Sequence, residues 1–268
     1  MRSLIKVGFG LLLLAFVLIA LFYGMLRAQG TTRPANPEGR VVASEARHVG
    51  NDVTSVVLGG PIDMTLRQGA VASLTVRGEQ RLLGNIGTVS EGNTLHIETK
   101  GMLLHHKQPL QVVLVLPSID SVRIHGSGDS TINGFSGDKI ALQLHGSGDV
   151  KFNGRYRAVE AGLQGSGDIE LNGGNSDKVD VSVVGSGSMT VVGAAKQFKV
   201  AQTGSGDLDA EHLSADTVAV ELMGSGSAVV QARKSATVNL RGSGDVNVHG
   251  NPDERNVTRN GSGDVTFE

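Results

Sequence analysis

The chain has 268 residues, a formal net charge of −2 and a pI near 6.4, so it lacks the strongly basic balance of nucleic-acid-binding proteins. It has no cysteine, which excludes disulfides and thiolate chemistry. It also has no tryptophan and only two tyrosines, which disfavours a carbohydrate groove built on aromatic platforms.

The N-terminal segment, residues 1–27, is predicted to be a membrane anchor or a signal sequence. Arg2 and Lys6 precede an apolar run from Val7 to Leu26. About 20 apolar residues are enough to cross a bilayer as a helix, and this run is longer than the apolar region of most signal peptides. We therefore expect one uncleaved transmembrane helix, with the rest of the chain outside the cytoplasm at the cell envelope. The alternative is cleavage after Ala28, which would give a periplasmic or secreted protein.

Residues 28–40 are rich in Gly, Thr, Pro and Asn and are predicted to form a linker. Residues 41–118 alternate apolar and polar side chains less regularly, for example over 62–66 and 110–116. Terminal units of repeat proteins are often atypical because they cover the open end of the core. We therefore expect one domain over 41–268, with 41–118 as an irregular opening section and 119–268 as the regular repeats.

A Gly-Ser-Gly phrase followed by Asp or Ser recurs eight times in the repeats. The copies begin at Gly126, Gly146, Gly165, Gly185, Gly204, Gly224, Gly242 and Gly261, in steps of 20, 19, 20, 19, 20, 18 and 19 residues. A fixed period of this length is typical of a fold in which each unit stacks on its neighbours.

Within each repeat, apolar and polar residues alternate with a period of two. In the second copy, Leu144, Val150 and both glycines share one parity, whereas Ser147 and Asp149 share the other. The pattern predicts strands with one buried and one exposed face, with inward glycines at corners where backbones approach closely. The glycines assigned to these structural corners are Gly126, Gly128, Gly146, Gly148, Gly165, Gly167, Gly185, Gly187, Gly204, Gly206, Gly224, Gly226, Gly242, Gly244, Gly261 and Gly263.

The repeats predict an all-β fold, a parallel β-solenoid (β-helix) of about eight coils with 19–20 residues each. Successive coils would pair in parallel, about 4.8 Å apart, around a thin apolar column. Antiparallel hairpins are the alternative, but hairpins would be expected to invert equivalent positions between neighbours rather than repeat one phrase in one direction.

An outward column of carboxylates follows the glycine corners. It consists of Asp129, Asp149, Asp168, Asp207, Asp245 and Asp264, and it is interrupted by Ser188 and Ser227. Carboxylates are calcium ligands, so these residues are weak candidates for a calcium site. The favoured interpretation is structural, in which each Asp or Ser hydrogen-bonds the backbone of its own turn.

Two further outward columns carry groups with binding chemistry. Asn133, Asn153 and Asn172 are expected to stack, as amide ladders do between parallel strands. His125 and His145 lie on neighbouring coils, but the next residues in their column are not metal ligands. We expect structural or solvated roles for both columns, and the sequence predicts no catalytic residue, no cofactor and no metal site.

Residues 114–129, which read Leu-Val-Leu-Pro-Ser-Ile-Asp-Ser-Val-Arg-Ile-His-Gly-Ser-Gly-Asp, resemble the start of the repeats in the bacterial head GIN domain, a glycine-rich envelope domain associated with autotransporter adhesins. Residues 60–69 and 93–98 fit its opening strands, and the resemblance covers about 41–268. It implies a β-solenoid in the bacterial envelope and supplies no catalytic residues.

The function expected from these features is non-catalytic binding or adhesion by an envelope-exposed, membrane-tethered solenoid. The alternatives are an enzyme that acts on an envelope polysaccharide and a passive or stress-associated scaffold. The expected partners are the membrane, through the N-terminal helix, and an envelope protein or polysaccharide, with no nucleic acid. Self-association through the C-terminal end near Phe267 is a further expectation, because an uncovered sheet edge invites pairing.

Overall fold

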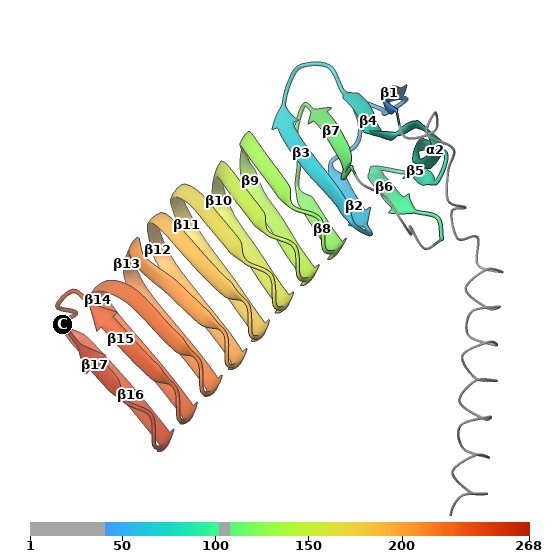
Figure 1. Cartoon of the computed structure of the whole chain (residues 1–268). Helices are drawn as coiled ribbons and strands as arrows, with labels where there is room; N and C mark the ends of the chain where they lie inside the picture. The colour runs from blue at the N-terminus through green and yellow to red at the C-terminus, as the bar shows by residue number, and fades with distance from the viewer. Residues whose placement is uncertain (1–40, 102–107) are drawn as a thin grey trace, which may run out of the picture.

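A computed structural model describes residues 41–101 and 108–268, which form an elongated all-β solenoid (Figure 1). Seventeen strands make one continuous sheet that winds around the core. The predicted anchor and linker lie outside the described residues. Within 41–101 and 108–268, no helix has the length and apolar character needed to cross a membrane.

The regular part consists of long strands that stack in parallel: β9 (Ser130–Gly146), β10 (Val150–Gly165), β11 (Ile169–Gly185), β12 (Ser188–Gly204), β13 (Asp207–Gly224) and β14 (Ser227–Gly242). The predicted parallel solenoid is therefore confirmed, and the hairpin alternative is wrong. The solenoid has about seven turns rather than eight.

Each coil is a flattened loop with two long sides (Figure 1). The first side follows a Gly-Ser-Gly corner, and the second side leads to the next corner. Between them the chain bends within a single long strand. The bend shows as register shifts in the pairing, for example between Asn153 and Gly154 and between Asn172 and Gly174.

The core is a column of apolar side chains enclosed by the two sides. Ile132, Phe152, Leu171 and Val191 are in register on successive coils, and each is at most 2% exposed. Tyr156 is also buried in this core, and its hydroxyl donates a 2.8 Å hydrogen bond to the carbonyl oxygen of Ile119. Burial, with a smaller contribution from Asp120, raises the pKa of Tyr156 well above its ordinary value, so the hydroxyl stays a donor.

Charges alternate in sign along the bend of the coils. This charge column consists of Asp138, Arg157, Asp177, Lys196, Asp216 and Lys234. Ion pairs join Arg157 to Asp138 and Asp177, Lys196 to Asp177, and Lys234 to Asp216, at 2.6–3.5 Å. Each charged residue in the column therefore has neighbours of the opposite sign on the adjoining coils.

The opening section contains a first turn that the sequence pattern did not reveal. β2 (Ser55–Gly59) and β3 (Ile62–Gln68) stack in parallel beneath β8 (Ser121–Gly126) and β9. Gly60, with a φ of 101°, takes the corner position under Gly126, and a Cβ on Gly126 would overlap the carbonyl oxygen of Gly60. Gly60-Pro61-Ile62-Asp63 is thus an altered copy of the repeated phrase.

The remaining strands of the opening section close the N-terminal end of the column. They are β1 (Val42–Arg47), β4 (Ser73–Glu79), β5 (Ile86–Glu91), β6 (Thr94–Thr99) and β7 (Leu110–Leu116), with a four-residue helix α2 (Gln80–Leu83). β6 and β7 continue the parallel stack on β2 and β3, whereas β1, β4 and β5 pair antiparallel. Leu82 and Leu83 of α2 are buried against the core.

The last coil, formed by β15 (Asp245–His249), β16 (Glu254–Gly261) and β17 (Val265–Phe267), carries arginines at inward positions. Arg255 and Arg259 are in register with the buried Ala236 and Leu240 of β14. Arg255 lies 4.8 Å from the centre of the Phe267 ring, and Arg259 pairs with Asp264 at 2.8 Å. Cationic groups therefore lie across this end of the column, and the predicted self-association there stays a prediction.

Candidate functional site

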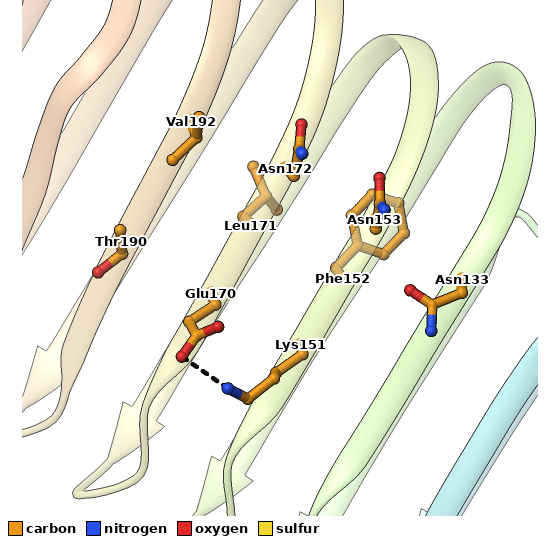
Figure 2. Close-up of a pocket in the computed structure, with 9 residues that line it drawn as sticks. All are labelled: Asn133, Lys151, Phe152, Asn153, Glu170, Leu171, Asn172, Thr190 and Val192. Carbon is orange, nitrogen blue, oxygen red and sulfur yellow. Dashed lines mark hydrogen bonds and ion pairs between the residues drawn. The ribbon is translucent and has the colours of Figure 1, made fainter.

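The candidate site is a shallow groove on the first sides of β9 to β12 (Figure 2). Its volume is about 380 Å³. It is lined by Asn133, Lys151, Phe152, Asn153, Glu170, Leu171, Asn172, Thr190 and Val192. The groove therefore crosses four coils and runs along the solenoid axis, perpendicular to the strands.

Strand alternation aims the three asparagines into the groove. Asn153 pairs in register with Asn133 on one side and with Asn172 on the other, so equivalent atoms recur at the strand spacing of about 4.8 Å. All three side chains are exposed, while the intervening Phe152 and Leu171 are buried below them. The groove thus presents a row of polar side chains on the outer face of the sheet (Figure 2).

The asparagines do not form the amide ladder expected from the sequence. Asn172 accepts a 3.3 Å hydrogen bond from the backbone N–H of Gly174. Within the described residues, the side-chain amides of Asn133 and Asn153 have no hydrogen-bond partner. Each therefore offers two N–H donors and a carbonyl acceptor to a ligand.

A compensated ion pair lies beside the asparagine row. Lys151 Nζ lies 2.9 Å from Glu170 Oε1, and the next residue in that column, Thr190, is neutral. The hydrogen bond with Glu170 and the charge of its carboxylate raise the pKa of Lys151, so the ammonium group stays charged. The ion pair between Lys151 and Glu170 has no net charge. Val192, which is 37% exposed, adds an apolar contact at the end of the groove.

The aspartate column joins adjacent coils. The carboxylate of Asp129 accepts a 3.0 Å hydrogen bond from the backbone N–H of Asp149, and Asp149 accepts one of 3.2 Å from Asp168. The same bond links Asp63 to Asp129, Asp168 to Ser188, Asp207 to Ser227 and Asp245 to Asp264, at 3.0–3.2 Å. Each carboxylate therefore accepts a hydrogen bond from the backbone of the next coil, and not from the backbone of its own turn as the sequence predicted.

These bonds give the aspartates a structural task without a cation. One oxygen of each carboxylate, from Asp63 to Asp245, is already directed at a backbone N–H group, and Ser188 and Ser227 interrupt the column. Across 41–101 and 108–268, no cluster of three or more His, Cys, Asp or Glu side chains is arranged to hold a metal ion. The weak calcium candidates gain no support from this geometry.

The histidine pair is a stack on the second side of the coils. The rings of His125 and His145 lie 4.9 Å apart with an interplanar angle of 17°. His145 Nδ1 lies 2.7 Å from Gln164 Oε1, and because an amide oxygen only accepts, the ring nitrogen is the donor. This bond holds His145 against Gln164 of β10, on the adjoining coil.

The two glycines of each corner are not equivalent. The second glycine, such as Gly167, is buried, whereas the first, such as Gly165, is partly exposed and has a φ of 135°. Cβ atoms on both would overlap carbonyl oxygens of the preceding coil, those of Gly148 and Gly146 respectively. The corner therefore excludes side chains because two backbones stack there, and the first glycine does not point fully inward as expected.

The asparagine column was predicted from the sequence, but with a structural role. Asp63 was not predicted, although Gly60 and Asp63 keep the Gly-x-x-Asp spacing of the repeats. The pairing of Lys151 with Glu170 beside the asparagines was not predicted either, although the 19-residue offset between the two residues matches the period of the repeats.

Comparisons with known proteins agree with this architecture. The family model described as "Putative auto-transporter adhesin, head GIN domain" matches residues 52–252. A crystal structure from Parabacteroides distasonis described as a "putative adhesin" has a TM-score of 0.80 at 21% identity and covers 86% of this chain and 98% of its own. No curated protein matches the chain.

Two further crystal structures share the fold. One from Parabacteroides distasonis, described as a "putative lipid binding protein", has a TM-score of 0.79 at 22% identity, over 85% of this chain and 96% of its own. One from Parabacteroides merdae, described as a "putative adhesin", has a TM-score of 0.77 at 17% identity, over the same shares of the two chains.

Proposed function

The chain belongs to the head GIN domain family, and from that premise we propose that it is a non-catalytic binding or adhesion module exposed at the cell envelope. The observation that carries this proposal is the groove, in which Asn133 and Asn153 present unpartnered amides on a rigid parallel sheet. Surface side chains held in register by the backbone form a preorganised site, which lowers the entropic cost of binding.

The names of two structural relatives, both described as putative adhesins, favour a surface-binding role. The name of the relative described as a lipid binding protein would instead favour an apolar ligand. The groove favours a polar ligand, because Val192 is the exposed apolar side chain among its lining residues. An acyl chain would leave the amides of Asn133 and Asn153 without partners.

Binding to envelope fragments tests the proposal. The purified full chain is compared with the Asn133→Ala/Asn153→Ala variant, which removes the two free amides without removing a hydrogen bond. The matched control is Asn239→Ala/Asn256→Ala, two exposed asparagines on the second sides of β14 and β16 that also lack side-chain partners in the described structure. We expect saturable binding that falls at least tenfold in the groove variant and stays unchanged in the control.

Three outcomes would contradict the proposal. If the Asn133→Ala/Asn153→Ala variant bound the fragments as tightly as the unmodified chain, the groove would not be the binding site. The absence of saturable binding by the unmodified chain would favour a passive scaffold. Steady release of new reducing ends from the fragments would favour an enzyme that acts on an envelope polysaccharide.

We further propose that residues 1–27 tether the module to the membrane. The motivation is the apolar run from Val7 to Leu26. The full chain should sediment with membranes, whereas a chain without residues 1–27 should not. A mature N-terminus that begins at Gln29 would contradict the tether and would indicate a cleaved signal peptide.

A further inference from the structure

We propose that the groove binds a neutral saccharide chain laid along the solenoid axis, with successive sugar residues opposite Asn133, Asn153 and Asn172. This inference rests on the proposed binding function and names its ligand class. The direction of the chain follows from the groove itself, which crosses β9, β10, β11 and β12 rather than following one strand (Figure 2).

The chemistry of the row favours hydroxyl groups. A carboxamide can donate and accept at the same time, and neighbouring sugar hydroxyls also donate and accept. One amide can therefore make two hydrogen bonds to an adjacent pair of hydroxyls. The free amides of Asn133 and Asn153 and the Thr190 hydroxyl supply such groups along the groove.

The spacing of the row favours a sugar chain over a peptide. Equivalent amides recur about every 4.8 Å, which is comparable to the length of one pyranose residue in an extended chain. A peptide strand repeats its facing side chains only about every 6.6 Å, so it falls out of step with the coils after one or two contacts. A saccharide can repeat the same contact on Asn133 and Asn153, and it can accept hydrogen bonds from the amide N–H groups of Asn172, whose oxygen already accepts the Gly174 N–H.

The charge of the groove favours a neutral ligand. Lys151 and Glu170 are 2.9 Å apart and compensate each other, and the other lining side chains are uncharged. A polyanion would meet the Glu170 carboxylate, and a polycation would meet the Lys151 ammonium group. A neutral sugar can bond to both without separating the pair.

The groove has no exposed aromatic ring, since Phe152 is only 2% exposed. Each sugar therefore contributes hydrogen bonds without stacking, and single oligosaccharides should bind weakly. Chain length should compensate, because each additional sugar reaches another coil until the row ends. Presentation of many groove copies on one cell surface would add avidity.

The test measures how affinity depends on chain length. Cello-oligosaccharides and chitin oligosaccharides of increasing length are titrated into the purified full chain and followed by calorimetry and by NMR shifts. For at least one series we expect affinity to rise up to about three or four residues and then to level off. Oligogalacturonates of equal length should bind at least tenfold more weakly.

Variants locate the interaction. Asn153→Ala interrupts the middle of the row and should lower the affinity for the preferred oligomer at least tenfold, whereas Asn239→Ala should leave it unchanged. Lys151→Gln/Glu170→Gln removes the charges but keeps polar groups, and it should relax the discrimination against oligogalacturonates. Equal affinities for Asn153→Ala and the unmodified chain would overturn the proposal, as would affinity that is independent of chain length or absent for every neutral oligomer.

A second experiment separates this inference from the function on which it rests. Envelope fragments are treated either with glycan-degrading enzymes or with protease before the binding assay. If groove-dependent binding survives protease and is lost when the glycans are degraded, the saccharide proposal is supported. If groove-dependent binding is lost with protease alone, the saccharide proposal is overturned and the binding function stands. If binding never depends on the groove, both the saccharide proposal and the proposed binding function of the groove are overturned.

Discussion

At the scale of single residues, Gly167 shows why the corners require glycine. It is buried at the second position of its corner, and a Cβ there would overlap the carbonyl oxygen of Gly148 on the preceding coil. We expect Gly167→Ala to lower the free energy of unfolding by about 1–3 kcal/mol, because the coils must separate locally to admit a methyl group. Denaturation of the purified protein measures this change.

The control is Ser166→Ala in the same corner. Ser166 is exposed, and its backbone N–H keeps its 3.0 Å bond to the Gly146 carbonyl oxygen whichever side chain it carries. This variant should therefore unfold at nearly the original denaturant concentration. If the two alanine variants were equally stable, close stacking of the corner backbones would not explain the glycines.

Asp149 provides the second residue-scale prediction. Its carboxylate accepts the N–H of Asp168, and its own N–H donates to Asp129, so it connects three coils. We expect Asp149→Ala to destabilise the fold by on the order of 1 kcal/mol, because one backbone N–H loses its acceptor. Asp149→Asn keeps an acceptor oxygen and should cost less.

Calcium provides an independent check of the same column. If the aspartates serve only as acceptors for backbone N–H groups, neither added calcium nor a chelator should change the melting temperature. A melting temperature that rises with calcium in the unmodified protein and no longer rises in Asp149→Asn would instead establish the cation site that the column resembles.

At the scale of elements, the charge column links the bends of successive coils. The hydrogen bond from Lys196, followed by that from Arg157, lowers the pKa of Asp177 below its ordinary value. We expect Lys196→Met to raise this pKa towards the ordinary value, as measured by NMR titration of the Asp177 carboxyl carbon. An unchanged titration would show that the 2.6 Å ion pair between Lys196 and Asp177 is not maintained in solution.

The direction of the pH dependence follows from this shift. A carboxyl group whose pKa is lowered in the folded state stabilises the fold fully above its unfolded pKa, and that stabilisation is lost as pH falls through the folded value. The contribution of Asp177 should thus be complete above about pH 4 and should disappear in more acidic solution. Because the pair is exposed, added salt should weaken it.

At the scale of the whole molecule, the repeats were the predictable part. The fixed period and the two-residue alternation determine which positions face inward, and parallel pairing of identical phrases follows from them. Gly60 and Asp63 escaped prediction because residues 69–120 separate this first turn from the coil that it contacts. The groove escaped because an unpartnered amide at Asn153 and a bonded one at Asn172 look the same in the sequence.

The repeats also predict that whole coils can be removed. Deletion of residues 165–184 joins Gln164 to Gly185, and deletion of 165–203 joins it to Gly204; both keep the glycine corners and apolar columns in register. The stability of repeat proteins is approximately a sum over units and their interfaces. Both shortened chains should therefore fold, with less stability than the full chain, as measured by circular dichroism and denaturation.

The two deletions differ in the charge column. In the full chain Arg157 lies between Asp138 and Asp177. The longer deletion places it between Asp138 and Asp216, which preserves the alternation, whereas the shorter one places it beside Lys196. Arg157→Ala should therefore cost similar stability in the full chain and in the longer deletion, and clearly less in the shorter one, with the difference shrinking as salt is added. An equal cost in both deletions would show that alternation along the column contributes nothing to coil register.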